Sequence, residues 1–194
     1  MGQRGQDLRG HSVYLQQRQR RKILHSKAKM NGSIPSIILG AVLQQTVANL
    51  QDVQEINQQL TIMGEGLGAR LVEIFLSQVP TSCRSFENAG NGIALAMRYF
   101  LTQFSSSIKD VSSGEDGISL LSATQTVMVI SIKSNPITAE MVLPRHLNSI
   151  KPDSIMCGAV QGALTTLGWA TVVTFEQDTL TITKTAEIVE ELAV

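Results

Sequence analysis

The residue best placed for chemistry in this sequence is Cys83, one of two cysteines. It lies in a short linker, followed by Arg84, directly before a predicted helix. The helix dipole and the adjacent guanidinium favour thiolate over thiol, and a thiolate near a surface is able to accept an acyl group. The alternative is an inert loop cysteine. Cys157 shares helical spacing with Ile155 and Val160 and is predicted to be a small buried core residue.

A cysteine hydrolase or acyl-transfer enzyme would need Cys83 as nucleophile and a histidine as base. His25 lies in the basic N-terminal segment, and His146 lies in a loop between Pro144 and Pro152. No sequence signature links either histidine to the cysteine. A thiol-dependent enzyme therefore remains an alternative hypothesis, and no catalytic residue is assigned.

The glycines of the run 64–68, Gly-Glu-Gly-Leu-Gly, suggest a phosphate-binding loop at first sight. Such a loop needs a strand that leads into a turn with free backbone N–H groups. Here the glycines fall inside a strongly helical apolar pattern, and no Lys-Ser or Lys-Thr pair follows. We therefore predict that these glycines let another backbone pack closely against the helix.

The composition favours one folded domain. The chain has 194 residues, of which 43% are hydrophobic and 16% charged, and this excludes a disordered chain. No apolar run reaches the roughly 20 residues that a membrane-spanning helix needs. Two cysteines and three histidines exclude a disulfide framework and make a structural metal site unexpected.

The net charge of zero conceals a basic N-terminal arm, residues 1–32. Its first 30 residues carry eight basic groups against one acid, Asp7, so the rest of the chain carries the opposite excess. A basic segment of this kind binds an anionic membrane or nucleic acid, serves as an import peptide, or is a disordered extension. A further possibility is that translation starts at Met30.

Helical spacing dominates the first half of the domain, which we place at residues 33–194. Ser33 and Pro35 open a first helix that runs to Leu50, with apolar positions from Ile38 onwards. A second helix extends from residue 53 towards Pro80 and carries one apolar stripe. The apolar stripes of these two helices should stay partly exposed, which predicts association. A third helix is predicted from Phe86 to about Phe104, capped by Ser85.

The second half changes to β-strand periodicity around one further helix. Residues 105–117 are rich in Ser, Gly and Asp and are predicted to be a loop. Strands are predicted at residues 126–132, 137–143, 169–175 and 180–184. A fourth helix begins after Asp153 as its cap and ends at Gly168. Residues 186–194 fit either strand or helix. The predicted fold is α+β, in the order helix, helix, helix, hairpin, helix, hairpin, with an antiparallel sheet of about four strands.

Several short motifs then occur in a characteristic order. They are Asn57-Gln58-Gln59-Leu60, Met63-Gly64, Leu67-Gly68, Arg70-Leu71, Phe75-Leu76, Cys83 with Phe86, Asn135-Pro136, Val142-Leu143-Pro144, Cys157-Gly158-Ala159-Val160, Gly162-Ala163-Leu164 and Phe175 with Gln177-Asp178-Thr179-Leu180. The series, over about residues 36–181, resembles the Bet-three-type small core subunits of the TRAPP vesicle-tethering complex.

The resemblance implies a non-catalytic scaffold subunit with the α+β fold described above. It also implies heterodimers with other small TRAPP subunits through the first helices. The whole complex would act on a Rab-type GTPase as a nucleotide exchange factor and tether vesicles travelling from the endoplasmic reticulum to the Golgi. The expected location is cytoplasmic, peripheral to cis-Golgi and endoplasmic reticulum membranes. No nucleic-acid partner is expected.

The resemblance also gives Cys83 a role, as the attachment site of a palmitoyl chain that lies in a channel in the core. No other cofactor is implied. Small residues on the third helix would leave space for the chain, namely Ala89, Gly90, Gly92, Ala94 and Ala96. The family has Arg where Ser82 stands, and a basic residue where Gln161 stands. These departures leave open a family member of the same fold that carries no lipid.

Overall fold

The structure is a computed structural model that describes residues 33–79, 83–101, 117–133, 135, 137–138 and 141–185. The predicted basic arm, most of the predicted loop at 105–117 and the tail from residue 186 lie outside the described residues. The elements are α2 (Ser33–Asn49), α3 (Val53–Gln78), α4 (Phe86–Leu101), β1 (Ile118–Ala123), β2 (Val127–Ile132), the short 3-10 helix η1 (Arg145–Leu147), α5 (Ser154–Thr166), β3 (Thr171–Glu176) and β4 (Thr179–Lys184). The α+β class and the predicted order of helices and hairpins are confirmed.

The four strands form one antiparallel sheet in the order β1-β2-β4-β3. The strand predicted at residues 137–143 is wrong, because Thr138 lies in a turn and Val142 is 92% exposed in irregular backbone. β2 instead forms its hairpin with β1, a strand that the sequence pattern did not reveal, and pairs with β4 on its other side. An irregularity between Leu120 and Ser122 breaks the alternation of its side chains, and alternation is the main sequence signal of a strand.

The helix ends follow the local sequence in most places. The Asp52 carboxylate accepts a hydrogen bond of 3.0 Å from the Glu55 amide, and the Ser85 hydroxyl accepts one of 3.2 Å from the Asn88 amide. The predicted cap at Ser85 is therefore confirmed. Gly168 ends α5 with a φ of +88°, a left-handed conformation that suits glycine. Asp153 precedes α5 as predicted, but its side chain makes no capping hydrogen bond and instead binds two other residues, described below.

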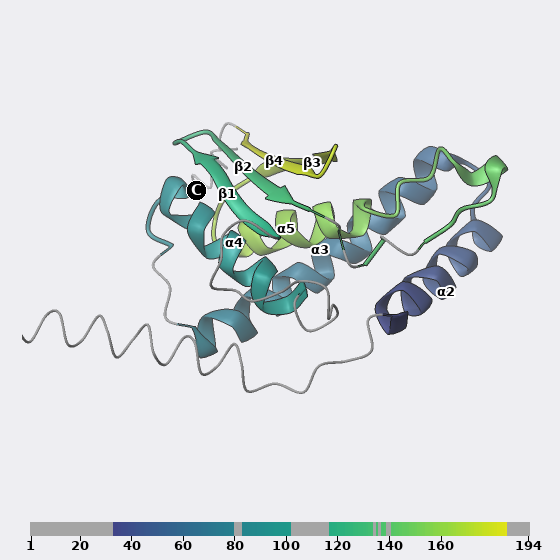
Figure 1. The fold of residues 1–194 in the computed structure, drawn as a ribbon, viewed down its shortest axis with the longest axis horizontal. Coiled ribbons are helices and arrows are strands. Elements are labelled where there is room, and N and C mark those ends of the chain that lie inside the picture. The colour runs from purple at the N-terminus through teal and green to yellow at the C-terminus, as the bar shows by residue number, and fades with distance from the viewer. Residues whose placement is uncertain are drawn as a thin grey trace, which may run out of the picture.

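The helices pack on one face of the sheet, with α4 against β1 and β2 and α5 against β3 (Figure 1). The main core lies between these layers and includes Met128, Ile130 and Ile182 from the sheet and Leu164 from α5. Helix α2 lies at the other end of the molecule, beside the first half of α3 and the segment that precedes α5 (Figure 1). The fold therefore has a sheet end and an α2 end, joined by the long helix α3.

Candidate functional site

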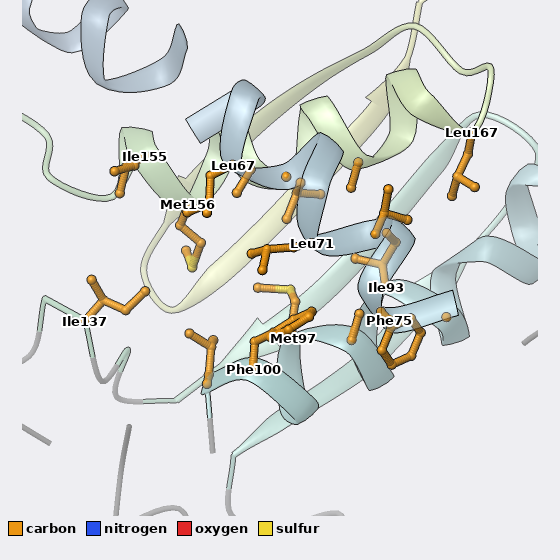
Figure 2. A pocket seen from close by; sticks show the side chains of 18 of the residues that line it. Leu67, Leu71, Phe75, Ile93, Met97, Phe100, Ile137, Ile155, Met156 and Leu167 are labelled. Carbon is orange, nitrogen blue, oxygen red and sulfur yellow. The ribbon is translucent and has the colours of Figure 1, made fainter. Parts of the chain in front are cut away.

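An apolar cavity of about 390 Å³ lies between α3, α4 and α5, and Figure 2 shows side chains of these helices around it. Its volume falls within the roughly 300–1,000 Å³ typical of small-molecule sites. The described lining residues include no charged side chain, hydroxyl or amide, and Cys83 is the one nucleophile among them. A group that fills this cavity must therefore be hydrocarbon in character.

The close crossing of α3 and α5 forms one wall of the cavity. A Cβ added to Gly64 or Gly68 would overlap the α5 backbone, and one added to Gly158 or Gly162 would overlap the α3 backbone. Four glycines thus interlock the two helices, and Gly68 also lines the cavity. The prediction that the glycines of the run 64–68 serve close packing is confirmed for Gly64 and Gly68, whereas Gly66 faces open space, and the run lies within a helix rather than in a phosphate-binding loop.

Helix α4 supplies the opposite wall and includes small residues. Gly92 and Ala96 line the cavity, as the sequence predicted. Ala89, Gly90 and Ala94 are buried outside the lining, so the space predicted beside these three is occupied by protein. A Cβ on Gly90, for example, would meet side chains of the sheet at 3.2–3.3 Å. Two of the five predicted positions therefore border the cavity, and three pack against the rest of the core.

The cavity is elongated along α5, from Leu167 at one end to Ile155 at the other. Figure 2 shows Leu167 and Ile93 towards one end, and Ile155 with Ile137 towards the other. At 1.5 Å per helical residue, the α5 side of the cavity is about 18 Å long. Such a shape fits a linear chain better than a compact ring.

Cys83 lines the cavity at the Leu167 end. It is four residues after Val79, at the end of α3, and three before Phe86. The Phe86 ring contacts that of Trp169, which follows Leu167 by two residues, with 6.0 Å between ring centroids. Cys83 is half-buried there and packs against the main core, so its side chain borders the apolar interior.

The expected activation of Cys83 is wrong in direction. Burial raises the pKa of the Cys83 thiol above its ordinary value of 9.0. The cause is desolvation of the thiolate by burial, and the side chain of Arg84 is exposed. Cys157 is buried as predicted, and its pKa is raised to about 11, first by burial and then by the charge of Asp153. Both cysteines are thiols at neutral pH.

The structure does not bring a histidine to Cys83. His146 is exposed on η1, and Leu147 beside it packs with Leu43 and Ile56 at the α2 end. His25 lies outside the described residues. The cavity lining offers Cys83 no base within the described part of the chain, so this geometry gives no support to a hydrolase.

A polar network holds the α2 end of the cavity. Asp153 accepts hydrogen bonds from the Asn135 amide at 2.8 Å and from the Thr138 hydroxyl at 2.9 Å. The Asn135 side chain in turn accepts one of 3.1 Å from the Ile137 amide, and the Ser36 hydroxyl donates one of 3.0 Å to the Ile137 carbonyl. The network fixes Ile137 against the cavity and ties the start of α2 to it. Sequence reasoning missed Ile137 as a lining residue, because an apolar residue in a predicted strand gives no signal for such a role.

The sequence matches the Transport protein particle (TRAPP) component family over residues 36–189. The chain belongs to this family. Among TRAPP proteins, it is 24% identical over 168 residues to trafficking protein particle complex subunit 3 of Dictyostelium discoideum, with 86% of this chain and 85% of that protein covered. It is 27% identical over 155 residues to transport protein particle subunit bet3 of Schizosaccharomyces pombe, with 78% of each covered.

A solved TRAPP structure shares the fold. It is the crystal structure of a trafficking protein particle complex subunit 3 from Naegleria fowleri covalently bound to palmitic acid. The TM-score is 0.67 and the identity 23%, with 82% of this chain and 98% of that chain covered. The chain is thus a divergent TRAPP component of the Bet3 type, and the resemblance drawn from its ordered sequence motifs is confirmed.

This TRAPP component exposes apolar side chains on its first two described helices. On α2, Ile37 is 67% exposed, and on α3 Ile62, Met63, Leu67 and Ile74 are each at least 40% exposed. None of the helices within the described residues is long and apolar enough to cross a membrane. The same residues contain no group of three or more His, Cys, Asp or Glu arranged to hold a metal ion.

Proposed function

We propose that this chain is a non-catalytic scaffold subunit of a TRAPP-type tethering complex, and that Cys83 carries a long fatty-acyl chain lying in the apolar cavity. The observation that carries the lipid proposal is the position of Cys83 at one end of an elongated cavity whose described lining is otherwise hydrocarbon or thioether. The covalently bound palmitic acid of the Naegleria fowleri relative supports the same chemistry.

The attachment step uses a long-chain acyl thioester such as an acyl-coenzyme A. The Cys83 sulfur attacks the thioester carbonyl carbon and forms a new C–S bond. The bond to the coenzyme A sulfur breaks, and coenzyme A leaves as the thiol after taking up the proton that Cys83 has lost. The product is an uncharged thioester, which suits a cavity that offers no partner for a carboxylate.

Burial of the chain supplies a large stabilising term. About 14 methylenes at about 0.8 kcal/mol each give roughly 11 kcal/mol as an upper bound. An acyl chain on Cys83 is therefore far more stable inside the cavity than in water. Because the lipid is held by the subunit itself, its first effect is on the stability of the fold.

The exposed apolar side chains of α2 and α3 support association with other small TRAPP subunits as heterodimers. The assembled complex then acts as a nucleotide exchange factor for a Rab-type GTPase and as a vesicle tether between the endoplasmic reticulum and the Golgi. In this role the subunit is cytoplasmic and peripheral to those membranes. Its contribution is packing and presentation of surfaces rather than turnover.

Intact-mass measurement of the full chain purified from eukaryotic cells tests the proposal. The expected mass includes one palmitoyl-sized acyl group, and neutral hydroxylamine should remove it, because hydroxylamine cleaves thioesters. Other small TRAPP subunits should copurify with the chain. A mass equal to the bare polypeptide would instead identify a family member of the same fold without lipid. Repeated turnover of an acyl thioester would identify an enzyme.

A further inference from the structure

The far end of the cavity is lined by residues from outside the packed helices α3, α4 and α5. Helix α2 contributes Ile38, Leu39 and Val42, and the turn before α5 contributes Ile137. Leu39 is buried, whereas Ile38 lines the cavity and is still 59% exposed. The N-terminal half of α2 thus borders both the cavity and the solvent.

The two halves of helix α2 make different contacts. Its C-terminal half packs through Leu43 on Ile56, Leu60 and Ile150, which are all buried. Its N-terminal half faces the cavity and is tied down by the hydrogen bond from Ser36 to the Ile137 carbonyl. Side chains that border an empty cavity lack contacts on that side. The N-terminal half of α2 therefore gains van der Waals contacts when a chain fills the cavity.

Cys83 and α2 lie towards opposite ends of the cavity, whose α5 side is about 18 Å long from Leu167 to Ile155. A short chain on Cys83 fills the Leu167 end and leaves the α2 end empty. A long chain reaches Ile155 and Ile137 and then contacts α2. The contacts of α2 therefore depend on the length of the attached chain as well as on its presence.

We propose that α2, together with Ile137, is the stop that determines which acyl chain length the cavity holds, and that a chain long enough to reach this stop stabilises the N-terminal half of α2. The inference rests on the proposed lipid attachment at Cys83. It adds to that proposal a length-determining element and a structural response, in a helix that also presents the exposed Ile37.

Hydrogen exchange on the full chain, with alkyl chains of two lengths attached chemically to Cys83, tests the inference. The probes are octyl and hexadecyl methanethiosulfonate, used on a Cys157→Ala variant so that Cys83 alone reacts. The Cys83 sulfur attacks the sulfenyl sulfur of the reagent, a disulfide to the alkyl chain forms, and methanesulfinate leaves. Mass spectrometry verifies one added chain before exchange begins.

Both chains should slow amide exchange in the first turns of α4, near Cys83. Only the hexadecyl chain should slow exchange in the N-terminal half of α2, by about tenfold. Ile155→Phe, which narrows the far end of the cavity, should abolish that protection, whereas Ile37→Phe, on α2 but outside the lining, should retain it.

Equal protection of α2 by both chains would overturn the inference, as would no protection by a fully attached hexadecyl chain. Failure of the hexadecyl reagent to attach where the octyl reagent attaches completely would also overturn it. Because these reagents need no cellular acylation, the result is independent of whether Cys83 is acylated in cells. Failure of the length effect and failure of the proposed function are therefore distinguishable.

Discussion

Gly68 on α3 lies directly against the backbone of Ala159 on α5, with no room for a side chain between them. The same relationship is repeated where Gly64 meets Ile155 and where Gly162 meets Glu65. Glycine permits this approach because it has no Cβ. The crossing fixes the spacing of two helices that both line the cavity, so it connects the stability of the fold to the shape of the site.

Gly68→Ala should destabilise the protein strongly, because a methyl group at this position overlaps backbone atoms of Ala159 that have no flexible end to move away. Overpacking of this kind costs about 1–3 kcal/mol or more. Gly66→Ala is the matched control, since nothing lies within 4 Å of an added Cβ and alanine is the better helix former by roughly 0.5–1 kcal/mol. Urea unfolding should show opposite shifts for the two variants. Equal shifts would contradict the proposed interlock.

The run 64–68 illustrates what the sequence was able to predict. Its glycines fall within a helical apolar stripe, and that context was sufficient to predict helix packing rather than phosphate binding, although only Gly64 and Gly68 meet the α5 backbone. The order of helices and hairpins was likewise predictable, because periodicity is a local property. The pairing of β2 with β1 was not predictable from the sequence. The irregularity near Leu120 hides the alternation of apolar residues in β1, and the apolar run from Ile137 has the pattern of a strand.

The candidate site was predictable in part. Cys83 was singled out by its position before a helix, but its pKa shift depends on desolvation by segments distant in sequence, which a local pattern does not report. Ile38 and Ile137 line the far end without any polar signature. Their role follows from the hydrogen bond of Ser36 with Ile137, a contact between residues 101 positions apart.

Cys83→Ser should abolish hydroxylamine-sensitive acylation and lower the melting temperature of the protein purified from eukaryotic cells. If only a fifth of the upper-bound burial energy is realised, the loss is about 2 kcal/mol, or about 4–8 °C for a chain of this size. Wild-type protein treated with hydroxylamine should melt at the same lower temperature. Cys157→Ala should retain the lipid, because Cys157 lies in the core outside the cavity lining. Retention of the lipid by Cys83→Ser would contradict the assigned site.

The rate of Cys83 acylation by an acyl thioester should rise steeply with pH. The thiolate is the nucleophile, and burial raises the pKa of the Cys83 thiol above 9.0. Below that pKa the thiolate fraction grows about tenfold per pH unit, so the rate should increase by about this factor from pH 7 to pH 8. Intact-mass time courses at several pH values measure it. A rate that levels off below pH 8 would indicate an activated thiolate, as the sequence alone had suggested.

Ala96→Leu should stabilise the protein without lipid and block acylation. Ala96 lines the cavity on α4, so a larger side chain fills empty space, a change commonly worth about 0.5–2 kcal/mol. Ala94→Leu is the matched control on the same helix, because Ala94 is buried outside the lining and has no space for a larger side chain. That variant should be destabilised by about 1–3 kcal/mol. Thermal unfolding measures the stability of both variants. Stabilisation by both would mean that the cavity extends beyond the assigned lining residues.

Ile37→Glu should weaken association of the chain with another small TRAPP subunit. Ile37 is 67% exposed on α2 and lies outside the cavity lining, so the substitution leaves the lipid site intact. Burying an isoleucine at an interface contributes about 1.5–3 kcal/mol, and an unpaired carboxylate there adds a desolvation penalty. The expected loss of affinity is therefore at least about tenfold.

Leu121→Glu provides the control for this experiment, because Leu121 is comparably exposed, at 61%, but lies on β1 at the sheet end of the molecule. Sedimentation of mixtures with the coexpressed partner subunit should show a full complex with Leu121→Glu and a dissociating one with Ile37→Glu. Both variants should retain their acyl group and melt within a few degrees of the parent chain. Loss of the complex with Leu121→Glu alone would move the interface from α2 to the edge of the sheet. Because α2 also lines the cavity, an interface there would bring the partner subunit against the helix that we propose to contact the end of the acyl chain.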